Sequence, residues 1–301
     1  QHRFGVEQRK LIKQKGLGVH FLSMTATPIP RSLALMIYGD LDVSIINEMP
    51  PGRKKIITKM VEPAKREKAY QFIRDQVKLG RQIFVICSLI EQKDEGEIEI
   101  INYPANPTSE KKSVLSEYEK LSKNVFPDLR VGYLHGKLKS TEKDAAMDDF
   151  KNKKIDILVS TSVVEVGVDI PNASVMMIEG AESFGLAQLH QFRGRVGRSS
   201  HQSYCLLFSS SVRQKSSERL KYFESNHDGF KLAEKDLEMR GPGEVYGTEQ
   251  SGEMNLRLAK LNDRELIKKA REAAKTIVSN SDKYPQVMKR VKDWEGKVHL
   301  E

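Results

Sequence analysis

The sequence predicts an α/β fold, in which a parallel sheet carries helices on both faces and a helical appendage follows. Strand-like apolar runs alternate with amphipathic helical segments between about residues 50 and 210. The runs are apolar at successive positions, which is typical of strands buried on both faces. After residue 211 the pattern becomes wholly helical. A chain of 301 residues with 39% hydrophobic composition is long enough for two domains.

The expected elements follow one another in a regular order, and turn residues separate them. A strand at 19–24 leads through a proline-bounded turn to a short helix at 31–38, which Gly39 ends. Glycine is frequent after helices because it adopts the left-handed conformation without steric cost. The expected strands of the sheet are 54–61, 82–90, 130–135, 155–160, 174–180 and 203–208, and the expected helices between them are 64–79, 109–123, 141–151 and 186–192.

Two other segments complete the predicted organisation. The acidic, turn-rich segment 91–107 is expected to be a surface insertion. The helical appendage is expected to contain four helices, with a glycine-rich break at 241–252 in their midst. These helices are 216–225, 229–239, 263–279 and 282–294.

Composition narrows the class of protein. The excess of nine positive charges, from 50 basic and 41 acidic residues, favours a polyanionic partner such as nucleic acid, although a solvated surface explains it equally well. Cys87 and Cys205 each stand alone in an apolar run, so we expect reduced core residues. Neither a membrane span nor a signal peptide is recognisable. These features predict a cytoplasmic protein, and the lack of an initiating Met predicts a piece of a longer chain.

The strongest functional signal is a run of three arginines spaced by glycines at the end of a predicted helix, Gln191-Phe192-Arg193-Gly194-Arg195-Val196-Gly197-Arg198. Guanidinium groups in such a run present fixed charges to phosphate oxygens with little steric obstruction. In an ATPase, such arginines stabilise the charge that develops on the transferred phosphoryl group. The alternatives are a disordered RNA-binding tract and a solvated face. The position inside an ordered strand and helix pattern favours the first interpretation.

A second signal lies at the end of the predicted strand 155–160. Ser160 and Thr161 end this strand, and a glycine turn with Gly167 and Asp169 follows. Ligands of open α/β sheets bind at the carboxyl edge, where these small polar groups are expected. Either hydroxyl is suited to a backbone phosphate, and the carboxylate of Asp169 to a ribose hydroxyl. An ordinary strand-to-loop transition with capping residues is the alternative.

The third signal is the segment 23–31, SMTATPIPR, in which Thr25 and Thr27 stand at a strand end before a proline-defined helix start. A plain turn explains this segment when it is taken alone. Together, however, the three signals resemble motifs III, V and VI of superfamily 2 helicases in order and spacing, and segments 85–91 and 133–136 fall where motif IV and its successor are expected. The resemblance covers nearly the whole chain and implies a RecA-like sheet of the P-loop-NTPase type.

Within this superfamily, three stretches resemble the RecG family. They are the start QHRFGVEQR, the linker MPPGRKKIIT, and DLEMRGPGE leading to GTEQSG. The last stretch is similar to the helical hairpin and loop that RecG shares with transcription-repair coupling factor, where they couple the ATP state to duplex movement. In the coupling factor we expect an RGAGN-type loop, so this sequence favours RecG, with the coupling-factor motor as an alternative.

The resemblance implies three parts and a set of residue roles. Residues 1–49 would be a remnant of the first RecA-like domain, 50–210 the second RecA-like domain, and 211–301 the helical hairpin with its translocation loop. Arg195 and Arg198 would be arginine fingers. The other implied roles are nucleotide binding by Gln191, Gly167 and Asp169, and DNA contact or coupling by Ser160, Thr161, Thr25, Thr27, Arg240 and Gln250.

For the whole protein, the resemblance implies an ATP-dependent DNA helicase that remodels replication forks and Holliday junctions in DNA repair and recombination. Its cofactors would be ATP and Mg²⁺, and its partners would be forked or junction DNA and the amino-terminal helicase half of the same chain. The sequence contains no G-x-x-x-x-G-K-[ST] phosphate loop, so this chain alone is expected to be inactive. A non-catalytic nucleic-acid-binding module is the alternative function.

Overall fold

The structure is a computed structural model in which residues 22, 24–26, 44–46, 48, 50–87, 90–92, 98–100, 107–161, 170–209, 214–240 and 264–295 are described. The chain divides into two compact units. One unit is Asn47–His227, and the other combines Gln1–Ile46 with Asp228–Glu301. The predicted division instead separated residues 1–49 from 211–301 and ended the sheet domain at 210.

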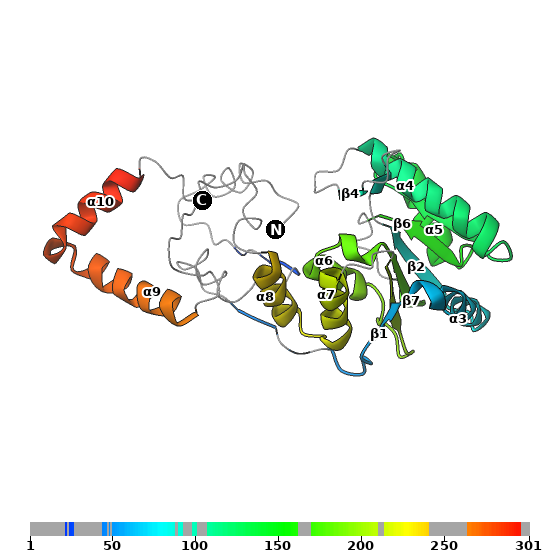
Figure 1. Ribbon diagram of the computed structural model, residues 1–301, viewed down its shortest axis with the longest axis horizontal. Coiled ribbons are helices and arrows are strands. Elements are labelled where there is room, and N and C mark those ends of the chain that lie inside the picture. The colour runs from blue at the N-terminus through cyan, green and yellow to red at the C-terminus, as the bar shows by residue number, and fades with distance from the viewer. Residues whose placement is uncertain are drawn as a thin grey trace. The chain divides into compact units, whose positions relative to one another are not determined.

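A six-stranded sheet forms the centre of the Asn47–His227 unit (Figure 1). Each neighbouring pair is parallel, which confirms the predicted α/β class. The central strands are buried at every position or nearly so, as their continuous apolar sequences predict. The strands are β1 (Ile57–Val61), β2 (Gln82–Cys87), β5 (Val131–Leu134), β6 (Ile157–Ser160), β7 (Ala173–Glu179) and β8 (Tyr204–Phe208), in the spatial order β1-β8-β7-β2-β6-β5.

Helices cover both faces of this sheet. On one face, helices α3 (Arg66–Lys78) and α4 (Pro107–Glu119) contribute to the main apolar core with Tyr70, Ile73 and Val114. On the other face, Phe150 of α5 (Ser140–Lys151) packs against Phe84 of β2, with ring centroids 4.9 Å apart. Helices α6 (Leu186–Arg193) and α7 (Gln214–Ser225) lie beside each other on this second face. Short turns of helix complete the unit, at η1 (Pro63–Lys65), η2 (Lys120–Val125) and η4 (Ala181–Ser183).

Two details of the unit differ from the predicted elements. The strand expected at 82–90 ends at Cys87, and Ile90–Gln92 forms a separate strand, β3, that pairs antiparallel with β4 (Ile98–Ile100). The expected surface insertion therefore contains most of a short hairpin, and in β4 two isoleucines flank the single acidic residue Glu99. Helix α7, which was predicted to belong to the appendage, packs on the sheet unit instead.

In the second unit, the described residues from 229 onward are largely helical, as predicted. They form α8 (Gly229–Arg240), α9 (Arg264–Ser279), the short turn η5 (Ser281–Lys283) and α10 (Pro285–Glu295). Several apolar side chains on α9 and α10 are exposed, namely Leu266, Val278, Val287 and Val291, and so is Tyr284 between η5 and α10. Among the helices of the described residues, none has both the length and the apolar character that crossing a membrane requires.

Candidate functional site

The arginine run is positioned by the loop that joins β7 to α6. Gly180 begins this loop with a left-handed backbone, φ 63°, which glycine adopts without steric cost. Arg66 of α3 holds Glu179 through two hydrogen bonds of 2.7 and 2.9 Å, and Arg219 of α7 donates to the carbonyl of Glu182. The loop is therefore anchored from helices on both faces of the sheet before it enters α6.

Arg193, the first arginine of the run, is buried, with 3% of its surface exposed. Its Nη1 donates to the carbonyls of Phe223 and Asn226 at 3.2 and 2.9 Å and contacts the hydroxyl of Thr58 at 3.4 Å. Burial lowers the pKa of this guanidinium to about 10. The expectation that all three arginines present guanidinium groups to phosphate is therefore wrong for Arg193, because α7 and β1 enclose its side chain.

Arg195 and Arg198 lie on the turn that follows α6, and both are half-buried. The N–H of Arg195 donates to the carbonyl of Phe192 at 3.0 Å, and Nε of Arg198 donates to the carbonyl of Gly194 at 3.4 Å. Val196 between them is buried. The turn thus fixes its own backbone through the buried Arg193 and Val196, while the two other arginines remain partly accessible.

Gly197 makes this turn possible. Its φ is 79°, and a Cβ atom placed there would lie 3.0 Å from Cγ1 of Ile56. Ile56 immediately precedes β1, so the arginine turn lies near the amino end of that strand. Gln191, on the last turn of α6, belongs to the same segment and is half-buried. Gln191, Arg195 and Arg198 therefore lie, each half-buried, on the end of α6 and the turn that follows it.

Ser160 and Thr161 lie elsewhere, at the carboxyl end of β6, where Ser160 pairs with Ile86 and Leu134. Both side chains are buried, with exposures of 0% and 1%. The hydroxyl of Ser160 has no hydrogen-bond partner among the described residues. In this structure neither hydroxyl is open to a ligand, and the two sets of predicted site residues occupy different ends of the sheet.

For the remaining predicted residues, the structure shows few or no contacts that bear on a site. Thr25 is exposed, and Arg240 is the last residue of α8. Gly167, Asp169, Thr27 and Gln250 lie outside the described residues. In the parts of the chain that the structure describes, no group of three or more His, Cys, Asp or Glu side chains is arranged to hold a metal ion.

Sequence reasoning missed the charged groups that support the arginine helix. Arg66 and Glu179 are 113 positions apart, so no local pattern connects them. Glu117 and Lys120 lie near this pair, with their charged atoms 3.1 Å apart. Burial raises the pKa of Glu117, and the charge of Lys120 offsets part of this effect. Only the tertiary structure reveals that these residues surround the end of β7.

Comparison with known proteins gives two family matches along the chain. Residues 64–200 match the helicase conserved C-terminal domain. Residues 226–294 match the carboxy-terminal part of domain 3 of the ATP-dependent DNA helicase RecG. The second match separates this chain from the coupling-factor motor that the loop sequence left as an alternative.

Individual relatives agree with these matches. The chain is 50% identical over 279 residues to the ATP-dependent DNA helicase RecG of Synechocystis sp., covering 92% of this chain and 32% of the relative. It is 46% identical over 292 residues to RecG of Thermotoga maritima, covering 97% of this chain and 36% of the relative. A solved structure of RecG bound to a three-way DNA junction aligns with a TM-score of 0.58 and 47% identity, covering 73% of this chain and 27% of the other.

The chain spans about a third of the length of the curated relatives it matches. The matched segments include four of the six strands of the parallel sheet (β2, β5, β6 and β7), the arginine turn, helices α8 and α9, and all but the last residue of α10. The chain therefore belongs to the RecG family and corresponds to the carboxy-terminal motor region of its members.

Proposed function

We propose that this chain forms the second motor half of an ATP-dependent DNA helicase that remodels replication forks and Holliday junctions in DNA repair and recombination. The proposal rests on the arginine turn. Arg193 is enclosed by protein, whereas Arg195 and Arg198 extend from a turn whose backbone is held in place. Preorganised cations of this kind stabilise charge that develops during phosphoryl transfer.

In this proposal the nucleotide is ATP with Mg²⁺, and its terminal phosphoryl group would be transferred to water. Arg195 and Arg198 would orient the terminal phosphate and offset its negative charge, while Gln191, Gly167 and Asp169 would contact the nucleotide. The magnesium ligands and the phosphate loop belong, in this proposal, to the first motor half of the whole protein. Residues 1–49 would be the remnant of that half.

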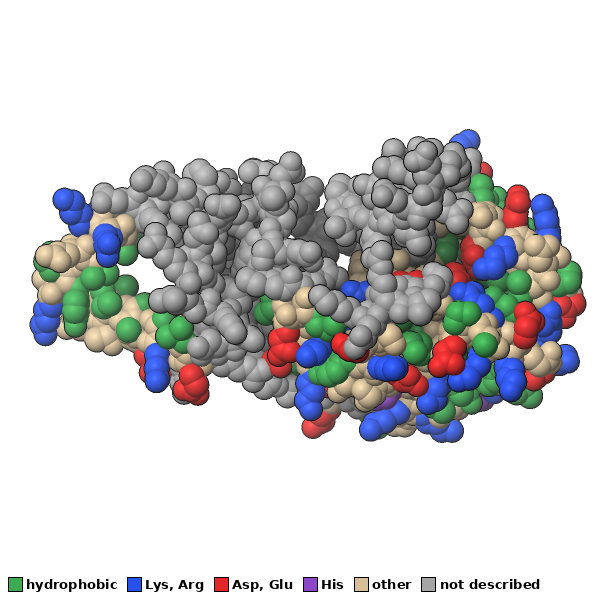
Figure 2. All heavy atoms as spheres, in the orientation of Figure 1, with side chains coloured by type: hydrophobic (Ala, Val, Ile, Leu, Met, Phe, Trp, Pro, Cys, Tyr) green, Lys and Arg blue, Asp and Glu red, His purple; other side chains and the backbone are tan. Residues whose placement is uncertain are grey.

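DNA is the proposed partner. The relative of known structure is bound to a three-way junction, and the net charge of +9 suits a polyanion. Figure 2 shows Lys and Arg side chains mixed with Asp and Glu on the visible face of the sheet unit, so this face carries no uniform basic field. The residues proposed to contact DNA or to couple ATP hydrolysis to its movement are Thr25, Thr27, Arg240 and Gln250. Ser160 and Thr161 are buried in this structure, so their proposed part is in the coupling rather than in direct contact with DNA.

The experiment uses the whole protein and measures ATP hydrolysis with and without forked DNA. Arg195→Ala and Arg198→Ala are each expected to lower DNA-stimulated turnover by roughly a thousandfold, the lower end of what an arginine finger contributes. Arg81→Ala, at a half-buried arginine between α3 and β2, is the control and should retain activity. Retention of turnover in both finger variants would refute the proposal. A whole protein that binds forks without hydrolysing ATP would favour the non-catalytic binding module.

A further inference from the structure

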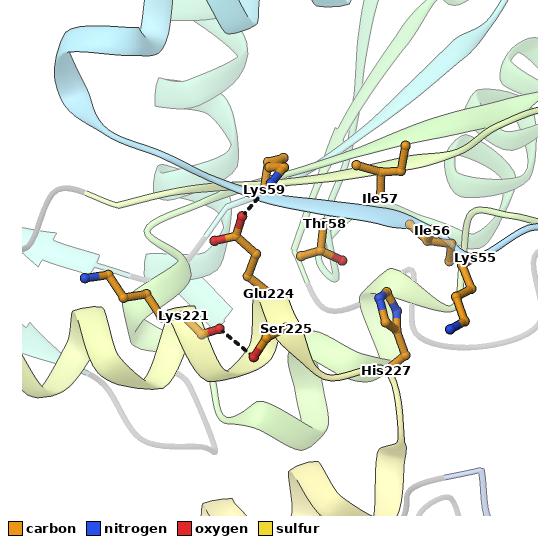
Figure 3. Close-up of a pocket in the computed structure, with 9 residues that line it drawn as sticks. All are labelled: Lys55, Ile56, Ile57, Thr58, Lys59, Lys221, Glu224, Ser225 and His227. Carbon is orange, nitrogen blue, oxygen red and sulfur yellow. Dashed lines mark hydrogen bonds and ion pairs between the residues drawn. The ribbon is translucent and has the colours of Figure 1, made fainter.

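A shallow hollow of about 480 Å³ lies where the amino end of β1 meets the carboxyl end of α7 (Figure 3). No predicted site residue lines it. Thr58 at its floor is 5% exposed, and the buried Arg193 contacts its hydroxyl. The other lining residues are Lys55, Ile56, Ile57 and Lys59 from the β1 segment, and Lys221, Glu224, Ser225 and His227 from the α7 segment.

The hollow contains more cationic than anionic groups. Its one lining carboxylate, Glu224, is paired with Lys59 at 3.1 Å. Lys55 and Lys221 have no acidic partner within the described ranges of the chain. Figure 3 shows Lys55 beside His227 at one end of the hollow and Lys221 at the other, with the Lys59–Glu224 pair between them. The hollow is therefore positively charged at its two ends, and the ion pair between them carries no net charge.

The field in the hollow is positive enough to affect a neighbouring histidine. Partial burial, together with the charges of Arg193 and Lys55, lowers the pKa of His227. A bound anion would offset these charges and make the arrangement more favourable. The carboxyl end of α7 carries a partial negative charge from the helix dipole, which disfavours anions. The positive charge of Arg193 offsets part of it. Arg193 donates to the carbonyls of Phe223 and Asn226 there.

We propose that this hollow and the exposed residues Arg53 and Lys54 next to it bind the phosphodiester backbone of DNA. Because the hollow is shallow and its cations lie at two ends, it suits an extended chain of phosphates rather than one small anion. A DNA strand provides such a series, with one charge for about every 3.4 Å along its axis. The choice of DNA rests on the proposed function. The hollow adjoins the arginine turn at Ile56, but Arg195 and Arg198 do not line it, and binding there needs no ATP hydrolysis.

The test measures binding of the 301-residue chain to a short fluorescent DNA duplex over a range of salt concentrations. The double variant Lys55→Ala/Lys221→Ala removes both ends of the hollow. At about 0.1 M salt, it should weaken binding about tenfold or more, and the slope of log K against log salt should decrease by about two, one for each lost phosphate contact. The matched control is Lys68→Ala/Lys151→Ala, which removes the same charge from exposed positions on α3 and α5.

A second readout follows the ring of His227 by NMR, with the His227→Gln variant identifying its signal. Binding of the duplex should raise the pKa of His227, because phosphates offset Lys55 and the buried Arg193. The other charges that line the hollow are Lys221 and the Lys59–Glu224 pair. Substituting Lys55 and Lys221 should abolish the change that DNA causes, in a protein whose thermal unfolding matches that of the control.

Four outcomes would overturn the proposal. The first is equal loss of binding in the hollow and control variants, and the second is no change of the His227 signal with duplex. The third is saturation of that signal by inorganic phosphate or ATP with no effect of DNA, which would indicate a small-anion site. The fourth is equally tight binding of polyglutamate, which would indicate an acidic protein partner. Loss of ATP hydrolysis in Arg195→Ala, with duplex binding intact, would leave this proposal standing.

Discussion

The guanidinium of Arg193 lies 4.1 Å from the centroid of the Phe223 ring and donates a 3.2 Å hydrogen bond to the carbonyl of the same residue. This contact joins the helix that precedes the arginine turn to α7. Both the cation–π interaction and the hydrogen bond stabilise the fold more strongly here because water is excluded from the contact. The first arginine of the run therefore holds the structure that positions the other two.

Substitution of Arg193 should destabilise the fold more than substitution of Arg195. Arg193→Ala leaves two carbonyls without their donor and a space beneath β1, so the free energy of unfolding should fall by about 3 kcal/mol. Arg195→Ala, at a half-buried position on the turn, should change it by less than about 1 kcal/mol. Urea unfolding of the 301-residue chain measures both values. Similar losses in the two variants would show that Arg193 has no special structural role.

The two glycines of the arginine turn should respond differently to substitution. Gly197 has a φ of 79°, and an added Cβ would lie 3.0 Å from Ile56, whereas the Cβ of Gly194→Ala would meet only an ordinary contact of 3.4 Å. Gly197→Ala should cost about 1–2 kcal/mol and displace the arginines, with a marked loss of ATP hydrolysis in the whole protein. Gly194→Ala is the control and should be nearly neutral. Equal effects on unfolding and on turnover would contradict this view of the turn.

The sequence predicted the sheet well because its signal is local. Apolar runs such as 82–87 and 173–179 are buried because exposing them to water is unfavourable. Turn residues such as Gly80 mark the ends of helices. The hairpin of β3 and β4 was missed because its strands contain three residues each and lie in an acidic segment. The membership of α7 in the sheet unit was missed because its amphipathic pattern does not say which surface it covers.

The site was predicted less completely, and the reason is again physical. The sequence motif does not distinguish Arg193 from Arg195 and Arg198. Their environments differ because the carbonyl groups that bind Arg193 belong to residues 30 and 33 positions later in the sequence. Burial of Ser160 and Thr161 likewise depends on neighbouring strands. A motif identifies side chains of the right type, whereas only the packing around them decides which remain open to a ligand.

Both cysteines should be unreactive while the chain is folded. Burial raises the pKa values of the Cys87 and Cys205 thiols to about 12, so thiolate is scarce at neutral pH. The prediction of two reduced core residues from the sequence agrees with this geometry. Labelling with a thiol reagent should proceed only as the protein unfolds and should yield two modified sites in urea. Rapid labelling of either thiol in native buffer would show that the core opens readily.

Glu117 is a carboxyl group near Arg66 and Glu179 whose pKa is raised by burial, although Lys120 offsets part of that effect. Because the folded state binds this proton more tightly than the unfolded state, the group stabilises the fold at low pH. That contribution decreases as pH rises from the unfolded value of about 4.3 through the folded pKa. Glu117→Gln removes the titration, so its stability relative to the wild type should improve as pH rises across this window.

Urea unfolding of the two proteins at several pH values between about 4 and 8 tests this sign, because the difference between them cancels the titration of other groups. Glu119→Gln, at an exposed position of the same helix, is the matched control and should give no comparable trend. A difference that moves in favour of the wild type with rising pH would mean that the Lys120 ion pair outweighs burial. Glu117 would then support the end of β7 as a charged partner rather than as a buried, readily protonated acid.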